Sequence, residues 1–388
     1  MSGAAARAFP EPEREIRRRI AAAGSIPFAE FMELALYRAG AGYYAREGAR
    51  TGLRSGDFAT SPDVSPDFGR RLAVQAAEVA ERLGGGPWDL VECGAGRGLL
   101  AADLADGLFG EAPQAARSLR RVWLVEPGGA HPERTLEERH PELDVRRVRR
   151  LEEIPRRSIR GFVVANELLD AMPVHLLQRW GGTLREGHVT EGRSGRLIFV
   201  RRPAPSGLVR LARRYRLCRR EGWRAEVSTA MEDWLGEIDR ILERGVVAVI
   251  DYGLEASRLA DEAHARGTLV AYRGHRIVLD VLAEPGRQDI TAHVNWTHLE
   301  DAARERDLVP AGRTTQDRAL LALGIAEDLL ARPGDSPAVT ARRLAARALI
   351  LPGPGGGKRF QVQLLARGLS GPFRALGDPF AGLARPGR

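Results

Sequence analysis

The stretch Asp89-Leu-Val-Glu-Cys-Gly-Ala-Gly-Arg-Gly-Leu-Leu-Ala-Ala102 joins a short apolar run to an acidic residue, three alternate glycines and a helical pattern. It predicts a strand, a tight turn and a helix that begins near Leu99. Glycines at Gly94, Gly96 and Gly98 let the backbone turn sharply and approach a ligand closely, and the helix directs free amide hydrogens into the same space. The stretch therefore predicts a cradle for a nucleotide-sized ligand.

The glycine spacing decides between kinds of nucleotide cradle. A dinucleotide-binding turn, G-x-G-x-x-G, requires glycine where this chain has Leu99. The remaining pattern, acid-x-G-x-G-x-G, resembles the first motif of S-adenosylmethionine-dependent methyltransferases, in which the turn holds the methionine part and the ribose. The residues that this resemblance assigns to the cofactor are Glu92, Gly94, Ala95, Gly96 and Gly98.

Strand patterns and helical patterns alternate along much of the chain. Buried-strand runs at 121–126, 144–151, 161–165 and 245–253 follow the first strand, with helical patterns between them. This alternation predicts an α/β fold with a mostly parallel sheet and helices on both faces. The alternating run 360–365 is predicted to be the last, edge strand of that sheet.

Two regions depart from the α/β pattern. Residues 1–70 predict an N-terminal helical extension and an ordered loop, whereas residues 71–388 predict the main domain. Within the main domain, about 174–230 predicts a β-rich insertion, and about 267–299 is a second unusual segment. Long ordered loops in compact domains are often functional, so the loop before residue 70 is expected to cover the ligand.

Acidic residues follow two predicted strands at the edge where open parallel sheets bind ligands. Glu126 ends the second strand, where a carboxylate can accept hydrogen bonds from both ribose hydroxyls; a surface carboxylate is the alternative. Glu152 or Glu153 follows the third strand, where such enzymes often meet the adenine ring. This edge of the sheet is therefore the predicted ligand site.

The fourth strand empties into a polar segment that begins with one of only two asparagines in the chain, Asn166. Because the chain contains so few asparagines, one at this position indicates that the ligand crevice needs a side-chain amide. The alternative is that Asn166 caps a helix. A helix from here would place Glu167 and Asp170 on the same face as the asparagine.

Composition limits the partners and the compartment. The chain of 388 residues carries a formal charge of +8, which by itself suggests nucleic acid or an acidic membrane. Lys358 is the single lysine among 59 basic residues, so the arginine excess indicates coding bias, and arginines interleave with acids, as in 133–139. A nucleic-acid partner is not expected on this ground.

Cysteines and hydropathy point to a cytoplasmic protein. Cys93 and Cys218 show no paired spacing, which argues against a disulfide framework and a zinc knuckle and favours a reducing cytoplasm. No apolar run reaches the roughly 20 residues of a membrane span, and the first ten residues lack a signal-peptide pattern. The cluster of His275, Asp289 and His293 matches no common metal-ligand spacing, so no metal is predicted.

Several stretches together resemble the MidA family, the bacterial relatives of a mitochondrial complex I assembly methyltransferase. The matching stretches, in chain order, are 56–69, the glycine turn, 166–174, 251–253 and 288–294. The resemblance implies a Rossmann-like class I methyltransferase fold, S-adenosylmethionine as cofactor, and methylation of an arginine in a partner protein. A respiratory-complex subunit is a candidate substrate, and a homodimer a candidate assembly. The further residues that it places at the cofactor are Thr60, Ser61, Pro62 and Asn166.

Arginine methylation makes its own chemical demand. A guanidinium is protonated in proteins, so carboxylates must orient it and stabilise its charge. The candidate carboxylates are Glu167, Asp170 and Asp289, and either His275 or His293 is the candidate proton acceptor.

Two other functions are considered. Methylation of a nucleic-acid base draws on the basic charge, but adenine-amine enzymes usually carry Asn-Pro-Pro-aromatic after the fourth strand, and here Glu-Leu-Leu follows Asn166. The other alternative is a catalytically inactive assembly factor that binds S-adenosylmethionine and holds a partner. Asp63, where the family usually has glutamate, is a departure that bears on the substrate.

Overall fold

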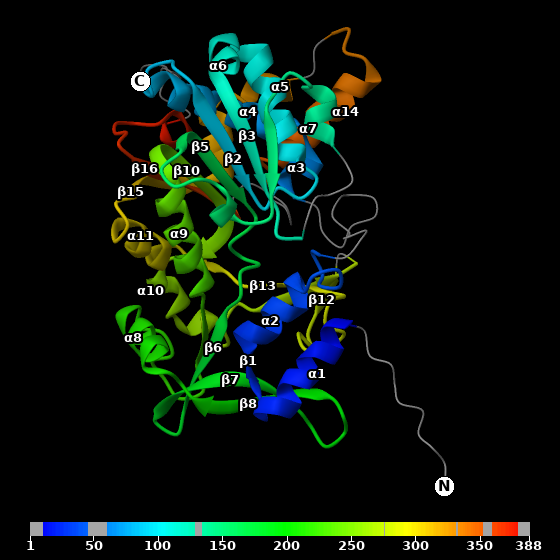
Figure 1. Ribbon diagram of the computed structural model, residues 1–388, viewed down its shortest axis with the longest axis vertical. Helices are drawn as coiled ribbons and strands as arrows, with labels where there is room; N and C mark the ends of the chain where they lie inside the picture. Colours follow the sequence, from blue (N-terminus) through cyan, green and yellow to red (C-terminus); the bar gives the residue numbers. More distant parts are fainter. Residues whose placement is uncertain are drawn as a thin grey trace, which may run out of the picture.

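The computed structural model describes residues 11–45, 60–128, 134–274, 276–330, 333–351 and 359–378. Its central sheet has the strand order β15-β16-β10-β5-β2-β3-β4, with the short β14 beside the end of β10 (Figure 1). These strands are β2 (Trp88–Cys93), β3 (Leu119–Val125), β4 (Val145–Val148), β5 (Ile159–Asn166), β10 (Leu242–Leu254), β14 (Val294–Asn295), β15 (Val309–Thr315) and β16 (Phe360–Arg367). Neighbours from β4 to β10 pair in parallel, and β16 is antiparallel to both of its neighbours. The predicted α/β, Rossmann-like fold is confirmed.

Helices cover both faces of this sheet because its strands are apolar on both sides. On β10, Val246 and Ala248 join the core of one face, and Val247 and Val249 join the other. One face packs against α4 (Asp67–Arg82), α5 (Leu99–Glu111), α6 (Pro113–Ser118) and α12 (Gln316–Ala322). The other packs against α9 (Ala230–Ile241) and α11 (Trp296–Arg304). The remaining helices of this part are α3 (Ser61–Val64), α7 (Thr135–Arg139), α10 (Ala256–Leu259), α13 (Ala326–Leu329), α14 (Pro337–Ala348), and the 3-10 turns η1 (Leu151–Glu153), η2 (Glu262–His264) and η3 (Arg374–Leu376).

The prediction that residues 360–365 form the edge of the sheet is wrong. β16 lies between β10 and β15, and β15 is the edge strand. Sequence reasoning missed β15 because Pro310 and Gly312 interrupt its pattern, and its register with β16 shifts between these two residues. Proline and irregular pairing are tolerated at a sheet edge, where one side of the strand needs no partner.

The N-terminal helices and the insertion form a second layered unit. Helices α1 (Glu11–Ala23) and α2 (Phe28–Tyr37) lie against an antiparallel sheet at one end of the molecule (Figure 1). That sheet has the order β1-β7-β6-β9, and β8 pairs with β7. Its strands are β1 (Ile26–Pro27), β6 (His175–Trp180), β7 (Thr183–Glu191), β8 (Leu197–Pro203) and β9 (Arg224–Val227), and α8 (Ser206–Arg214) packs beside it. Helices α1 and α2 thus lie within residues 1–70, and strands β6 to β9 lie within about 174–230.

The segment around 267–299 forms a small antiparallel sheet of its own. It comprises β11 (Val270–Arg273), β12 (Arg276–Val278) and β13 (Asp289–Thr291). Ala271 and Ile290 from this sheet share a core with Phe31 and Met32 of α2, so the sheet and the helix hold each other in place.

In the described part of the chain, no helix has the length and apolarity that crossing a membrane requires.

Candidate active site

The glycine turn follows β2, and its backbone angles require glycine. Gly94, Gly96 and Gly98 have φ angles of +73°, +48° and +74°, in the left-handed region that side chains disfavour. The amides of Gly94 and Ala95 both donate to the carbonyl oxygen of Val125, at 2.9 and 3.1 Å. The turn is thereby fixed to the end of β3, and α5 begins directly after it, as predicted.

Two buried acids lie at this turn. Glu126 accepts hydrogen bonds from the amides of Gly96 at 2.8 Å and Gly128 at 3.0 Å. Glu92 accepts one from the amide of Ala101 at 3.1 Å and is 4% exposed. Burial raises the pKa of Glu126 and raises that of Glu92 to about 8. Both carboxyl groups line one pocket.

The segment around α3 is fastened to both sides of the pocket. Thr60 donates to Asp63 Oδ2 from its amide at 3.1 Å and its hydroxyl at 2.9 Å. Asp63 forms an ion pair with Arg97 of the glycine turn. The amide of Ser61 donates to Glu167 Oε1 at 3.0 Å. At position 63 this chain has aspartate where the family usually has glutamate, and the aspartate forms an ion pair with the glycine turn.

The segment after β5 is not a helix, so the helical prediction from Asn166 is wrong. Glu167 has φ +51°, a costly angle for a residue with a side chain. Asp251 Oδ2 accepts the amides of Leu169 at 2.9 Å and Asp170 at 3.2 Å. In a helix that began at Asn166, the amide of Asp170 would instead donate to the carbonyl oxygen of Asn166. Asp251 thus fixes these residues as an irregular loop.

Burial makes the carboxyl groups of this loop unusually basic. Glu167 Oε1 also accepts from Asn166 Nδ2 at 3.2 Å, and burial raises the pKa of Glu167 to about 8. Burial raises the pKa of Asp170 to about 6 and that of Asp251 well above its usual range. Such shifts are typical of functional sites.

Two tyrosines form an aromatic wall that sequence reasoning missed. Tyr37 and Tyr44 stack with ring centroids 5.6 Å apart and planes at 23°. Tyr44 donates to Asp289 Oδ1 at 2.7 Å, and Tyr37 donates to the carbonyl of Ala171 at 3.0 Å. Burial raises the pKa of both phenols well above its usual range, so both remain neutral donors.

These parts enclose a pocket of about 150 Å³ at the carboxyl ends of the parallel strands. The predicted residues that line it are Thr60, Pro62, Glu92, Gly94, Ala95, Gly96, Glu126, Asn166 and Glu167. Residues that line it without having been predicted include Tyr37, Tyr44, Asp63, Arg97, Pro127 and Leu168. Ser61 and Gly98 adjoin it through their backbones.

The other predicted residues lie elsewhere. Asp289 lies behind the tyrosine wall, and Asp170 lies near enough to raise the pKa of both phenols. His293 lines a separate cavity of about 20 Å³, with its ring edge-on to Tyr252 at 5.4 Å between centroids. Burial lowers the pKa of His293 to about 4, so it is a weak proton acceptor.

The two acids predicted to meet the adenine ring lie away from the pocket. Glu152 and Glu153 do not line the pocket, and Glu153 Oε1 instead accepts the amides of Arg149 and Arg150 at 2.8 and 2.9 Å. These bonds direct Glu153 toward its own turn. His275 and residues 46–59 of the predicted covering loop lie outside the described residues.

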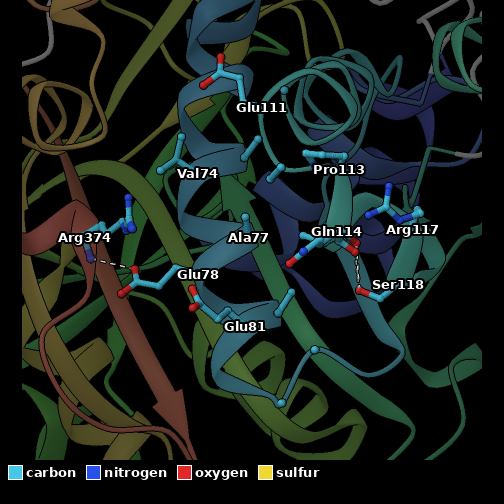
Figure 2. A pocket seen from close by; sticks show the side chains of 17 residues that line it. Val74, Ala77, Glu78, Glu81, Glu111, Pro113, Gln114, Arg117, Ser118 and Arg374 are labelled. Carbon is cyan, nitrogen blue, oxygen red and sulfur yellow. Dashed lines mark hydrogen bonds between the residues drawn. The ribbon is translucent and has the colours of Figure 1, made fainter.

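A larger hollow of about 1210 Å³ lies at the opposite end of the sheet, between α4, α5 and α6 (Figure 2). Glu78, Glu81 and Glu111 border it, and Glu78 accepts the amide of Arg374 at 2.9 Å. It is broadly open and adjoins the amino ends of β2 and β3, whereas open parallel sheets bind ligands beyond the carboxyl ends. The pocket at the glycine turn is therefore the candidate active site.

Comparison with known proteins gives the family. Residues 71–314 match the model of a family described as S-adenosyl-L-methionine-dependent methyltransferases. The Drosophila melanogaster protein arginine methyltransferase NDUFAF7 homolog is 31% identical over an alignment of 326 positions, which covers 76% of this chain and 70% of that protein. The Danio rerio NDUFAF7 is 27% identical, over 90% of this chain and 85% of its own length. The chain belongs to the MidA family of S-adenosylmethionine-dependent methyltransferases.

A solved structure extends the MidA match beyond the central sheet. The crystal structure of a superfamily member from Burkholderia thailandensis bound to S-adenosylhomocysteine superposes with a TM-score of 0.84 at 31% identity. It covers 96% of this MidA chain and 94% of the other. A native structure from the same organism gives 0.81 at 32% identity. The similarity therefore includes the N-terminal helices and the insertion.

The MidA pocket fits the expected cofactor. Gly96 has open space where a Cβ would be, on the pocket side of a turn with left-handed backbone. Asn166 Oδ1 is buried without a hydrogen-bond partner among the described residues, so it can accept from a ligand cation. A glycine cradle, a free amide oxygen and two carboxyl groups suit a ligand with an ammonium group and ribose hydroxyls.

Replacing Asp251 is expected to loosen the loop of this MidA enzyme. In Asp251→Ala the amides of Leu169, Asp170 and Tyr252 lose their acceptor. Leaving buried donors unsatisfied costs about 1–3 kcal/mol each, so the free energy of unfolding should fall by about 2–4 kcal/mol after local relaxation. Urea denaturation measures this loss. Unchanged stability would show that water replaces the carboxylate.

Proposed function

We propose that the protein transfers a methyl group from S-adenosylmethionine to a guanidinium nitrogen of an arginine in a partner protein. The observation that carries this proposal is that Glu167 and the Tyr37–Tyr44 wall line the same pocket as the glycine turn. Aromatic faces attract guanidinium groups, and carboxylates bind them with directed hydrogen bonds. This combination favours arginine as the acceptor.

Residues on the glycine-turn side are proposed to hold the cofactor. The carboxylate of Glu126 is suited to accept from ribose hydroxyls, and Asn166 Oδ1 to accept from the ammonium of the methionine part. The backbone of Gly94 to Gly96 permits close approach. When bound, S-adenosylmethionine supplies a methyl group on a positively charged sulfur.

Residues on the loop side are proposed to prepare the acceptor. A guanidinium that enters beside Glu167 favours ionisation of its carboxyl group, which then orients the acceptor nitrogen. The nitrogen loses one proton as it gains the methyl group, so the product is a methylated guanidinium that keeps its single positive charge. The carboxylate of Glu167, whose pKa burial raises to about 8, can accept that proton. Tyr44, held by Asp289, keeps the wall in place. Loop and wall together also exclude water from the reacting atoms.

The relatives support a protein acceptor. Those from Drosophila melanogaster and Danio rerio are named mitochondrial protein arginine methyltransferases. A respiratory-complex subunit as substrate, a homodimer and a cytoplasmic location remain predictions from the sequence. Both cysteines are buried and unpaired, which is compatible with a reducing compartment.

Methyl transfer to cell extract tests the proposal. The protein is incubated with S-adenosylmethionine carrying a labelled methyl group and with protein and RNA fractions of an extract. Mass spectrometry of the hydrolysed fractions should find labelled methylarginine. Labelled nucleosides without methylarginine would instead support base methylation. Calorimetric binding of S-adenosylmethionine without any product would support the non-catalytic holding role.

A further inference from the structure

The inserted antiparallel sheet region carries the positive charge of the chain. Residues 174–230 contain 13 arginines and four acids, a charge of +9 within a chain whose total is +8. The rest of the chain is therefore almost neutral. A coding bias acts on the whole chain and does not produce this asymmetry. The expectation that the arginines interleave with acids is wrong for this segment.

The few acids of the insertion are engaged with neighbouring groups. Glu186 is 2% exposed, with Oε1 2.6 Å from His175 Nδ1. Glu226 accepts hydrogen bonds from the amide of Thr268 at 2.9 Å and its hydroxyl at 3.0 Å. Glu221 accepts two backbone amides of the β6–β7 turn, at 2.7 and 3.2 Å. The surface that faces solvent is therefore dominated by arginine.

Strand register brings three of these arginines to one face of the inserted sheet. Arg185 and Arg224 both lie opposite the same β6 position, Gln178, and Arg201 lies on the same side of the sheet. Among the described residues, none of the three arginines has an ion-pair partner. Arg201 and Arg224 border a hollow of about 110 Å³, whose apolar lining includes Leu176 and Phe199. The name basic face is used below for Arg185, Arg201, Arg224, Leu176, Phe199 and Trp180.

The basic face is suited to carboxylates. The guanidinium of Arg201 lies 3.8 Å from the centroid of the Trp180 ring and donates to Gln178 Oε1 at 2.7 Å. These contacts hold the guanidinium in one place while Trp180 remains 49% exposed. Single-stranded nucleic acid is commonly bound by stacking bases on free aromatic faces, and here Arg201 covers one face of Trp180. The fixed guanidinium of Arg201, together with the two further arginines and the apolar hollow of the basic face, instead favours an acidic segment that also carries apolar side chains.

Helix α2 connects the basic face to the candidate active site. Phe28, at the start of α2, lies 5.6 Å from Phe199 of the basic face between ring centroids. Tyr37, the last residue of α2, lines the pocket. Nine helical residues rise about 14 Å, which an extended peptide spans in about four residues.

We propose that the basic face is a docking site for an acidic, partly apolar segment of the protein substrate. This inference rests on the proposed function, because it assigns that segment to the protein whose arginine enters the pocket. The geometry places the segment about four residues from the methylated arginine. The site would thus select its substrate by charge outside the pocket.

A binding measurement tests the docking site without requiring methyl transfer. The probe is a fluorescein-labelled 14-residue peptide with one arginine and, four residues away, a run of glutamate and leucine. Fluorescence anisotropy at 50 mM NaCl should show binding that weakens as salt is added. The double variant Arg201→Glu, Arg224→Glu should weaken it at least tenfold without changing the affinity for S-adenosylmethionine.

A matched variant and a second probe decide the result. Arg193→Glu with Arg210→Glu makes the same charge change at exposed positions away from the basic face, and should change peptide affinity less than twofold. Equal losses in both double variants, or no binding to the wild type, would overturn the proposal. Tighter binding of a 14-nucleotide single-stranded RNA, lost in the first variant, would overturn it in favour of nucleic acid. Peptide binding by a protein that forms no methylarginine would refute the proposed function and leave the docking site supported.

Discussion

Glu167→Gln is expected to reduce methyl transfer about a thousandfold, within the range for removal of an acid–base group. Glutamine has the same shape, and its side-chain oxygen can keep both hydrogen bonds, from the amide of Ser61 and from Asn166 Nδ2, because both already reach one atom, Oε1. The substitution therefore removes the charge and the proton-accepting group without removing the contacts that hold the loop. The affinity for S-adenosylmethionine should change less than threefold.

The pH dependence gives this prediction a second readout. The carboxyl group must be ionised to orient a guanidinium, and its pKa is about 8. At saturating S-adenosylmethionine, kcat/KM for the protein acceptor should rise about tenfold per pH unit below pH 8 and level off above it. Arginine does not titrate in this range. Glu167→Gln should remove this rise.

The matched control for Glu167→Gln is Glu138→Gln, which makes the same chemical change at an exposed position of α7. Activity and pH profile should match those of the wild type. Radiolabel transfer measures the rate, and calorimetry measures cofactor affinity. Normal turnover by Glu167→Gln would show that Glu167 does not accept the proton of the guanidinium. The proposal of arginine methylation would then lose its main support.

The central sheet was predictable because its information is local. The glycine turn, the buried runs and the acid that ends β3 each occupy a few consecutive residues, and periodicity identifies such segments. β15 was missed because Pro310 and Gly312 interrupt its pattern, and its place beside β16 depends on pairing between distant residues. Sequence patterns contain little information about such pairing.

The acceptor side of the site was less predictable because distant residues determine its shape. A helical spacing was a fair expectation from Asn166 to Asp170, but Asp251 accepts the amide of Asp170, which a helix would direct to the carbonyl oxygen of Asn166. Tyr44 acquires its role only through Asp289, which lies 245 residues away in the chain. Neither constraint leaves a local pattern. The charge of the insertion, in contrast, was countable from the sequence, and averaging over the chain concealed it.

Gly96→Ala is expected to weaken S-adenosylmethionine binding by about 2–3 kcal/mol, the usual cost of overfilling a packed site. This corresponds to roughly 30- to 140-fold in Kd. Nothing in the described structure lies within 4 Å of the position that the new Cβ would take, so the protein has room for it. The added methyl group would instead occupy space on the ligand side of the turn, because Gly96 lines the pocket.

Backbone strain and steric exclusion can be separated by the choice of measurement. At φ +48°, alanine is strained with and without ligand, so the strain of about 1–2 kcal/mol lowers the melting temperature but largely cancels from the binding free energy. Gly110→Ala adds the same methyl group to α5, again with nothing within 4 Å and without a positive φ. It should leave Kd unchanged and slightly raise stability. Calorimetry could instead find the wild-type Kd for Gly96→Ala despite a lowered melting temperature. The turn would then not approach the cofactor at Gly96, and the closest approach of backbone to cofactor would have to lie at another residue of the turn.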